Sequence, residues 1–377
     1  MNAERGALRE VAREFTRREV APYLQGWEDA GEVPRDLHRA AAKQGLLGIS
    51  FPVEVGGGGG DLLDSIAVME GMFSEGASSG LMAALFTSGI ALPHLAASGD
   101  ADLVDRFVRP TLAGELIGSL AVTEPGGGSD VAGIRTAAVR EGDVYVVDGT
   151  KTFITSGARA DFVTTAVRTG GPGPAGVSLL VVEKGTPGFT VDRSLPKTGW
   201  HCSDTAELGY AGVRVPVRNL VGTEHSGFAQ IARHFVVERI ALAVHGYGIA
   251  ARSLALTATY CRERETFGRP LLANQVVRHR LVEMRRQVEV ARAYVHEVAR
   301  RHVAGEDAIA EACLAKQTAA ECAAYVCDAA VQLHGGTGYL HGTEVERHHR
   351  DARILPIGGG ATEVLTDLAA RLMGYTP

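Results

Sequence analysis

Residues 118–133 read GSLAVTEPGGGSDVAG, and the pattern of the sequence changes at the start of this stretch. Before it, apolar residues recur at roughly helical spacing, as Leu8, Val11 and Phe15 do among many Arg and Glu residues. After it, short alternating segments such as residues 143–148 are bounded by glycine turns, a pattern typical of strands. The stretch therefore marks the passage from a helical region to a compact β-region, which could close into a barrel.

Long helical segments follow the β-region. Residues 228–265, 275–304 and 309–333 contain few helix breakers, and lengths of about 30 residues are typical of an antiparallel bundle or an oligomeric helical core. The first third also predicts helices over residues 40–47 and 65–73. Strands and helices do not alternate as they would in a parallel dinucleotide-binding sheet, so the glycine clusters do not fit a Rossmann fingerprint. This order predicts a mainly α protein with a central β-domain.

The composition excludes several classes of protein. A chain of 377 residues with 45% hydrophobic and 22% charged residues is large enough for two or three domains with a sizeable core. The formal charge of −6 leaves no basic footprint for nucleic acid and no polybasic segment for membrane lipids. No apolar run reaches the length of a membrane span, and residues 2–18 lack the apolar core of a signal peptide. We expect a cytoplasmic protein that binds neither nucleic acid nor a membrane.

Cysteine usage gives no sign of a metal site. The odd number of cysteines and the absence of a CxxC pair argue for reduced thiols and against a structural zinc site. The five residues are Cys202, Cys261, Cys313, Cys322 and Cys327. We expect no bound metal.

Glycine is over-represented, with 47 residues, and its clusters carry the candidate chemistry. In residues 123–130, TEPGGGSD, consecutive glycines let backbone N–H groups approach a flat or anionic ligand, and Thr123 and Ser129 add hydroxyls. The alternative is a tight turn that opens the β-region. In residues 149–157, GTKTFITSG, Phe153 could form one wall of a planar cofactor site, or it could belong to the core.

Three further clusters lie in the C-terminal third. Residues 262–270, RERETFGRP, place three arginines around a turn between two predicted helices, which suits a pyrophosphate but also a solvated helix end. Residues 332–339, QLHGGTGY, and residues 350–353, RDAR, precede the run 357–363, IGGGATE. A glycine loop that opens a last helix at about Thr362 would present free N–H groups to an anion or a carbonyl.

Taken together, the order and spacing of these motifs resemble those of the acyl-CoA dehydrogenase family of flavoproteins over essentially the whole chain. Two correspondences are the most specific: AVTEPGGGSDVAG at residues 121–133, and QLHGGTGY through RDAR at residues 332–353. Further motifs follow in the expected order: TFITSG at residues 152–157, residues 202–205, and RETFGRPL at residues 264–271 with Gln275.

The resemblance implies an activity, an assembly and a fold. The implied reaction is FAD-dependent dehydrogenation of an acyl-CoA thioester to the trans-2-enoyl-CoA in fatty acid metabolism, with an electron-transferring flavoprotein as electron acceptor. The implied assembly is a homotetramer, a dimer of dimers, with one FAD per subunit. The implied domains are an N-terminal helical domain (1–117), a middle β-barrel-like domain (118–226) and a C-terminal four-helix bundle (227–377).

The resemblance also implies which residues contact FAD. The group against the isoalloxazine would be Leu120, Val122, Thr123, Gly128, Ser129, Phe153, Ile154 and Thr155, with Ser129 also near the CoA moiety. The group on the adenosine pyrophosphate portion, across a subunit interface, would be Arg264, Thr266, Phe267, Asn274, Gln275, Gln332, Leu333, Gly335 and Gly336. Ala361 and Glu363 would also lie near the flavin, although the family often has Thr and Gln there, so these two side chains depart from the pattern.

The chemistry of the family needs one carboxylate. It removes the proton α to the thioester carbonyl while the β-hydrogen leaves as a hydride to flavin N5, so the base must face the flavin across the substrate. In most members this base is a Glu in the loop just after the RDA motif. Gly359 occupies that position here, and glycine cannot act as a base.

Some members, among them the isovaleryl-CoA and long-chain enzymes, carry the Glu on the first long bundle helix, just before an Arg. Glu238 and Arg239 stand at that place. Independently of the resemblance, Glu238 falls on an otherwise largely apolar seam with four-three spacing, formed by Ile231, Phe235, Leu242, His245 and Ile249. A carboxylate there would be desolvated and its pKa raised, as a base working near neutrality requires.

The hypothesis is therefore that Glu238 is the base and that Arg239 contacts the CoA portion or supports the site. The thioester carbonyl would be polarised by the flavin 2′-hydroxyl and a backbone N–H of Gly359 or Gly360. The alternative is that Glu238 is a helix-surface charge or a buried partner of a nearby arginine. Arg239 itself points roughly 100° away around the helix, so these two side chains need not pair.

Two questions stay open at the level of sequence. The protein could instead be a dehydrogenase or oxidase acting on an acyl group held by a carrier protein, or a catalytically silent flavoprotein scaffold. The small residues Ala243, Gly246 and Gly248 on the predicted base helix could leave room for a long or branched acyl chain, or could serve close helix packing.

Overall fold

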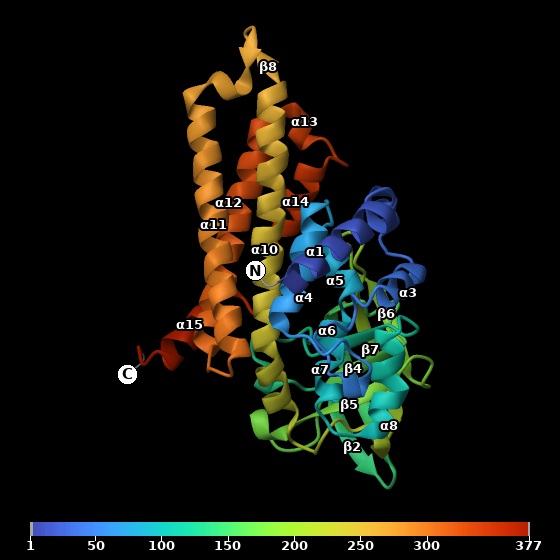
Figure 1. Ribbon diagram of the computed structural model, residues 1–377. Helices are drawn as coiled ribbons and strands as arrows, with labels where there is room; N and C mark the ends of the chain where they lie inside the picture. Colours follow the sequence, from blue (N-terminus) through green and yellow to red (C-terminus); the bar gives the residue numbers. More distant parts are fainter. Residues whose placement is uncertain (1–2, 376–377) are drawn as a thin grey trace.

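The computed structural model describes residues 3–375, and its elements follow the chain from N-terminal helices through a β-sheet to a helical bundle (Figure 1). The N-terminal helices include α4, whose first turn is closed by a capping box between Asp61 and Asp64 and against which α1 packs. They are α1 (Ala3–Phe15), α2 (Leu24–Ala30), α3 (Arg35–Lys43), α4 (Leu62–Ser74), α5 (Ser79–Leu85), α6 (Ser88–Ala91), α7 (Pro93–Ala96), α8 (Ala101–Leu103) and α9 (Arg109–Leu112).

One predicted helix is displaced. The sequence pattern placed a helix over residues 40–47, whereas α3 begins earlier and ends at Lys43. Gly45 has a φ of 71°, the left-handed conformation that commonly closes a helix, and it stops α3 at this point. Leu46 and Leu47 are buried beyond the helix end, so their apolar character reflects a core position and not a helical turn.

The middle region is a single curled sheet of seven strands. The pairing order is β1-β4-β2-β3-β7-β6, with β5 added to β4. β1 and β2 pair in parallel with β4, and the other pairs are antiparallel. The strands are β1 (Gly118–Ala121), β2 (Ala137–Glu141), β3 (Val144–Thr155), β4 (Phe162–Arg168), β5 (Val177–Glu183), β6 (Phe189–Ser194) and β7 (Thr205–Pro216). The predicted central β-domain is confirmed.

The C-terminal part is a helical bundle in which three long helices lie side by side (Figure 1). These are α10 (Gly227–Glu263), α11 (Gln275–Val303) and α12 (Ile309–His334), each within two residues of its predicted bounds. The shorter elements are the hairpin strands β8 (Glu265–Thr266) and β9 (Arg269–Pro270), and the helices α13 (Gly336–Tyr339), α14 (Glu344–Ala352) and α15 (Thr362–Leu372). The lower part of α10 lies beside the sheet, because Gly227 packs directly on the backbone of Ser178.

The small residues of α10 serve close packing. A side chain on Gly246 would begin 2.6 Å from the carbonyl oxygen of Ala319 on α12. A side chain on Gly248 would begin 2.5 Å from the ring of Phe73 on α4. Ala243 is fully buried. Of the two explanations for these residues, the close approach of helices holds at Gly246 and Gly248, and neither glycine leaves space for a substrate chain.

Helix α10 is also the one helix in residues 3–375 that has the length and apolar composition to cross a membrane. Within its most apolar window, 67% of the helix is buried inside the protein. Core helices of soluble proteins pass the same test of length and composition.

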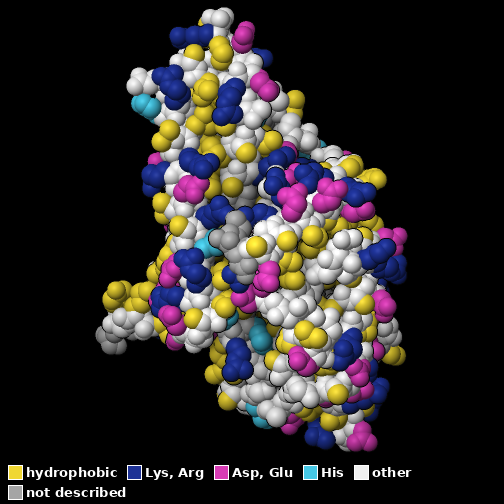
Figure 2. Space-filling model, viewed as in Figure 1, with side chains coloured by type: hydrophobic (Ala, Val, Ile, Leu, Met, Phe, Trp, Pro, Cys, Tyr) yellow, Lys and Arg dark blue, Asp and Glu magenta, His cyan; other side chains and the backbone are white. Residues whose placement is uncertain are grey.

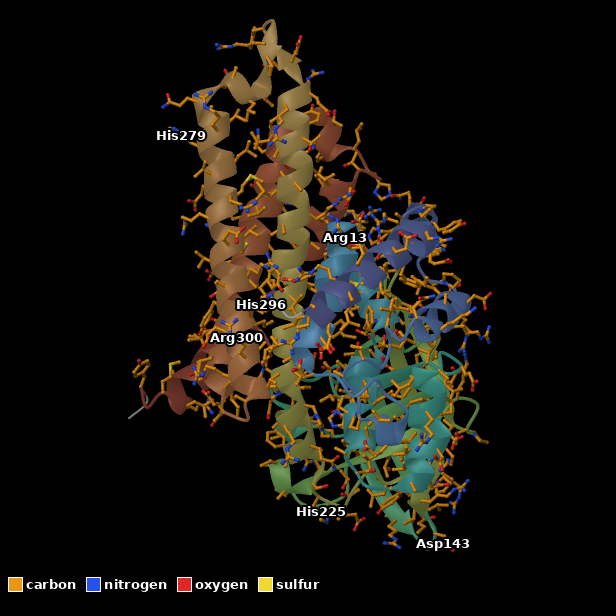
Figure 3. All side chains as sticks on the ribbon, viewed as in Figure 1. Arg13, Asp143, His225, His279, His296 and Arg300 are labelled. Atoms are coloured by element: carbon orange, nitrogen blue, oxygen red, sulfur yellow. The ribbon has the colours of Figure 1, made fainter. Side chains whose placement is uncertain are left out.

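A buried carboxylate joins the N-terminal helices to the bundle. Glu70 on α4 accepts hydrogen bonds from Arg292 Nε at 2.8 Å, His296 Nε2 at 2.9 Å and Tyr247 O–H at 3.1 Å, and it also pairs with Arg9. Burial opposes ionisation, but the hydrogen bond from His296 and the charges of Arg292 and Arg9 outweigh it and lower the pKa of Glu70 to about 2. Figure 3 labels His296, on α11 where the bundle meets the N-terminal helices.

Candidate active site

The glycine-rich loop after β1 is fixed to β3 by a buried ion pair. Lys151 Nζ donates to Glu124 Oε1 and to Val122 O, both at 2.9 Å, and the lysine side chain is fully buried. Glu124 also accepts from the backbone N–H groups of Arg135 and Thr136, at 2.7 and 2.8 Å. Burial disfavours the Glu124 carboxylate, yet the Lys151 charge and these hydrogen bonds lower the pKa of Glu124 to about 2. The base of the loop is therefore rigidly held.

This anchoring brings the two predicted flavin-facing segments together. Thr152 N donates to Thr123 O at 2.9 Å, and Ser119 Oγ donates to Thr155 O at 2.6 Å. Residues 125–130 stay exposed above this junction. The glycine loop and the end of β3 therefore form one surface.

Phe153 lies on that surface. Its ring is 67% exposed and its φ is 59°, a backbone conformation that is uncommon for a bulky residue and marks a site under functional constraint. The alternative that Phe153 belongs to the core is excluded by this exposure, whereas the neighbouring Ile154 is buried and can offer only its backbone to a ligand. No atom lies within 4 Å of where a side chain on Gly126 or Gly127 would begin. An exposed ring beside open glycine backbone and two hydroxyls fits a flat, partly polar cofactor such as a flavin.

The second predicted cofactor group lies at the opposite end of the molecule, around the β8–β9 hairpin (Figure 1). Phe267 at the hairpin tip is fully exposed, with a φ of 52°. The rings of Tyr260 and His334 stack with centroids 4.3 Å apart and join the ends of α10 and α12. Residues 264–275 and 332–336 therefore lie at the same end, where Lys and Arg side chains gather in the view of Figure 2. A single chain does not bring the two cofactor groups together.

Glu238 lies where the loop of residues 358–360 meets α10. A side chain on Gly359 would begin 3.6 Å from Glu238 Oε1 and would collide with Leu242 Cδ1, one turn further along α10. Gly359 and Gly360 have φ values of 65° and 111°, in the region that favours glycine. The structure thus places the glutamate directly against the glycine at which the sequence resemblance puts the usual base.

The surroundings of Glu238 suit a base. Its side chain is half-buried on the seam that includes the buried residues Ile231 and Ile249, and among residues 3–375 it forms no ion pair. Burial raises the pKa of Glu238 to about 7, and the charges of Arg239 and Lys316 oppose that rise. A carboxylate with a pKa near neutrality can accept a proton and release it again during turnover.

Arg239 is buried and forms no ion pair within the described part of the chain, although its charge acts on the neighbouring Glu238. It is 8% exposed, its guanidinium lies 5.8 Å from the ring centroid of Phe235, and its Nε has no hydrogen-bond partner in the described part of the chain. An unpaired buried guanidinium is costly. The site therefore offers a polar or anionic group of a ligand a place beside Glu238.

The loop of residues 358–360 offers two backbone hydrogen-bond donors. The backbone N–H groups of Gly359 and Gly360 have no acceptor among the described residues, and Thr362 N closes the loop by donating to Pro356 O at 3.0 Å. Ala361 precedes α15 and is half-buried, whereas Glu363 in its first turn is exposed.

Lys316 on α12 was missed by the sequence reasoning. It is 1% exposed, and its Nζ donates to Gly360 O. Burial lowers the pKa of Lys316 to about 8, against the opposing charge of Glu238. The signal that could have revealed it is a single lysine among small residues that recur at helical spacing, such as Ala312, Cys313 and Ala319.

Within residues 3–375, no group of three or more His, Cys, Asp or Glu side chains is arranged to hold a metal ion. The five cysteines are buried and carry free thiols.

The sequence matches three family models that together span most of its length. They are described as the acyl-CoA dehydrogenase N-terminal domain over residues 2–115, middle domain over residues 119–213 and C-terminal domain over residues 225–374. The long-chain specific acyl-CoA dehydrogenase of Rattus norvegicus mitochondria is 38% identical over 375 residues, 98% of this chain and 86% of that protein.

Solved structures extend the comparison. A crystal structure of a protein from Mycobacterium smegmatis, described as an acyl-CoA dehydrogenase, has a TM-score of 0.99 and 57% identity, covering 100% of this chain and 99% of that one. The prolyl acyl carrier protein oxidase AnaB has a TM-score of 0.94 and 27% identity, covering 99% of this chain and 100% of that one.

Proposed function

The chain belongs to the acyl-CoA dehydrogenase family, and from this premise we propose that it removes the α and β hydrogens of an acyl-CoA thioester with Glu238 as the catalytic base. Members of the family are FAD-dependent oxidoreductases, and this chain is one of them. The observation that carries the proposal is the approach of Glu238 Oε1 to the position that a side chain on Gly359 would occupy, 3.6 Å away.

In the proposed reaction, Glu238 takes the proton from the α-carbon. The electron pair of that C–H bond forms the new double bond as the β C–H bond breaks. FAD, when bound, accepts the β-hydrogen together with its electron pair. Because its pKa is about 7, a substantial fraction of Glu238 is a carboxylate at neutral pH, and the fraction grows as the pH rises.

The chain's other residues position the thioester and the cofactor. The free N–H groups of Gly359 and Gly360 are donors that would polarise the thioester carbonyl and acidify the α-proton. The buried guanidinium of Arg239 would take a polar group of the CoA portion. The flavin would lie on the surface formed by residues 120–129 and 153–155, and its adenosine pyrophosphate would be held by the hairpin end of a partner subunit. This placement supports a homotetramer and requires at least a dimer.

Two names among the relatives bear on the substrate. The rat enzyme is named for long-chain acyl-CoA, and the family members known to carry their base on this helix act on branched and long chains, which supports such a substrate here. AnaB, similar in fold, is described as an oxidase of a prolyl group on an acyl carrier protein, so a carrier-bound acyl group is the second candidate. For the reduced cofactor we propose an electron-transferring flavoprotein as the acceptor.

A substrate panel tests the function. FAD-loaded protein is mixed anaerobically with acyl-CoA thioesters of increasing length and branching, and with the same acyl groups on a carrier protein, while the absorbance of oxidised flavin is followed. We expect rapid bleaching by a long or branched acyl-CoA and formation of the 2-enoyl product. Bleaching only by carrier thioesters would favour the second candidate, and no bleaching by any thioester would indicate a silent scaffold.

Reoxidation separates a dehydrogenase from an oxidase. After bleaching, air or an electron-transferring flavoprotein is admitted to the reduced protein. We expect fast return of the oxidised flavin spectrum with the flavoprotein and slow return with oxygen. Fast reoxidation by oxygen would assign the chain to the oxidases.

A further inference from the structure

Lys316 is the one charged side chain that α12 directs into the region between α10 and the loop of residues 358–360. Its position is fully enclosed, with 1% of the residue exposed, and Ala315 and Ala319 beside it are fully buried. Its ammonium group donates to the carbonyl oxygen of Gly360, which is the single hydrogen-bond acceptor it has among the described residues. A buried ammonium has three donors, so this lysine is only partly satisfied by the protein's own hydrogen bonds.

The carboxylate whose charge acts on Lys316 is that of Glu238, although the two side chains form no ion pair. The charged and titratable groups that act on Glu238 are Arg239 on its own helix and Lys316 on α12, while the glycine loop contributes backbone only. Cys313, one turn before Lys316, is a further titratable group that faces the lysine. Two cations therefore face one carboxylate in a largely desolvated space, and of the two only Lys316 also holds the loop.

We propose that Lys316 is a positioning residue of the dehydrogenation: through its hydrogen bond to the Gly360 carbonyl it fixes the loop of residues 358–360 over Glu238, and its charge opposes protonation of the Glu238 side chain. The inference rests on the proposed function, because it acts through Glu238 as the base. It adds a residue on a third element, α12, to a site otherwise built from α10 and the glycine loop.

The loop needs such an anchor. Its three glycines bring no side chains, and two of them have φ values of 65° and 111°, so the backbone is intrinsically free to change conformation. The bond from Lys316 holds the Gly360 carbonyl on the side of α12, which fixes the peptide plane between Gly360 and Ala361 and so restrains the chain directly after the Gly359 and Gly360 N–H groups. A loop displaced by even a fraction of an ångström would misalign the carbonyl with the base.

The same lysine counters the cost of burying Glu238. Burial favours the protonated carboxylic acid, which cannot act as a base. A nearby cation favours the carboxylate and lowers its pKa, and burial leaves Lys316 with a pKa of about 8, so that it is charged at neutral pH. Loss of the lysine charge would therefore raise the pKa of Glu238 further and reduce the fraction of active base at neutral pH.

The test uses three substitutions in the FAD-loaded protein and the pH profile of kcat/KM with the best substrate of the panel. Lys316→Met removes donor and charge, Lys316→Gln keeps a donor without charge, and Lys316→Arg keeps both. The acid limb of this profile is the fall of kcat/KM at low pH, and in the parent we expect its midpoint near pH 7. In the Met and Gln variants we expect the midpoint to move up by about one pH unit. Their activity at pH 7 falls several-fold and recovers above pH 8, whereas the Arg variant keeps the parent's limb.

A control and a second readout separate this role from a merely structural one. Lys197 is also largely buried and donates to a backbone carbonyl, Ser203 O, at 2.6 Å, but its charged neighbours do not include Glu238. Lys197→Met should leave the acid limb in place even if it lowers thermal stability. In parallel, pH-difference infrared spectra should show the protonated Glu238 carboxyl band, identified by its absence in Glu238→Gln, persisting to higher pH in the Lys316→Met protein.

The outcomes are distinct. If the acid limb and the infrared band of the Met and Gln variants match those of the parent, the inference about Lys316 is overturned. If a Met variant does not fold, the Gln variant carries the same test. Unimpaired bleaching in Glu238→Gln would overturn the proposed function itself, whereas an inactive Glu238→Gln protein with an unmoved limb in the Lys316 variants would overturn only this inference.

Discussion

At the scale of single residues, the site depends on which of two neighbouring positions, 238 or 359, carries the carboxylate. Gly359 stands where a carboxylate would otherwise be carried, and Glu238 reaches the same place from the neighbouring helix. The backbone of Gly359 is left-handed, and Leu242 fills the space that a side chain on Gly359 would need. Position 359 therefore favours glycine while Glu238 lies against it. The glycine is as specific a feature of this site as the glutamate.

The first prediction concerns Gly359→Ala. Its Cβ would collide with Leu242 Cδ1, and an L-residue at a φ of 65° costs about 1 kcal/mol more than glycine. We expect a lower thermal-unfolding midpoint and slower flavin bleaching, because Leu242 lies one turn from Glu238. Gly358→Ala is the matched control for stability: its Cβ would meet only Ile354 at 3.6 Å, an ordinary contact, and its midpoint should stay near that of the parent. Equal midpoints for the two variants would contradict the steric argument.

The sequence predicted some residues of the site and not others, for a physical reason. Glu238 was predicted from the helical spacing of its apolar neighbours, from the family resemblance, which puts the base of some members at this place, and from the absence of a side chain at Gly359. Lys316 was missed because its role depends on a contact with Gly360, 44 positions later, that no local periodicity encodes. The exposed ring of Phe153 was left undecided between core and cofactor wall, because spacing alone does not show that its φ is positive.

At the scale of elements, the cofactor surface is held by the junction between the loop after β1 and strand β3. Lys151 and Glu124 each stand inside a predicted cofactor motif, yet both side chains face the protein and not the ligand surface. Their ion pair connects the two motifs from beneath. The order of the elements and the bounds of α10, α11 and α12 were predicted from periodicity, but this junction was not, because it depends on how the loop folds back onto β3.

The second prediction follows from this junction. Lys151→Met removes the donor to Val122 O and leaves the Glu124 carboxylate buried without its cation. This loosens the glycine-rich loop of residues 123–130. We expect weaker FAD retention, measured as the ratio of flavin to protein absorbance after gel filtration. Lys184→Met, at an exposed position between β5 and β6, is the control and should retain FAD like the parent. Full FAD occupancy in the Lys151 variant would show that the ion pair does not hold the loop.

At the scale of the whole molecule, the N-terminal helices pack against the bundle through the contacts of α4 with α10 and α11. Glu70 is the polar centre of that contact and gathers Arg9, Tyr247, Arg292 and His296 from three other helices. Its pKa of about 2 lies below the ordinary value of 4.5, so its ionised form stabilises the folded protein. This contribution is complete above about pH 4.5 and is lost as the pH falls toward 2.

The third prediction concerns Glu70→Gln. We expect it to lower the stability at pH 7 by about 3 kcal/mol, since two arginines and a histidine lose their buried anion. The urea midpoints of variant and parent should differ at pH 7, and the difference should shrink below about pH 4.5 as the pH is lowered toward 2. Glu297→Gln on α11, where both partners of the Glu297–Arg300 pair are exposed, should change the midpoint little. A constant difference between Glu70→Gln and the parent at every pH would contradict the role of ionised Glu70.

The account rests most heavily on Glu238 as the base, and Glu238→Gln in a single-turnover anaerobic experiment tests it most directly. The substitution keeps the size of the side chain and removes the proton acceptor, so we expect a yellow, FAD-loaded, stable protein whose bleaching by the best substrate is slower by roughly a thousandfold or more. Glu141→Gln, which alters an exposed carboxylate on β2, should bleach at the parent's rate. Bleaching of the Glu238→Gln protein within a few-fold of the parent's rate would contradict the assignment.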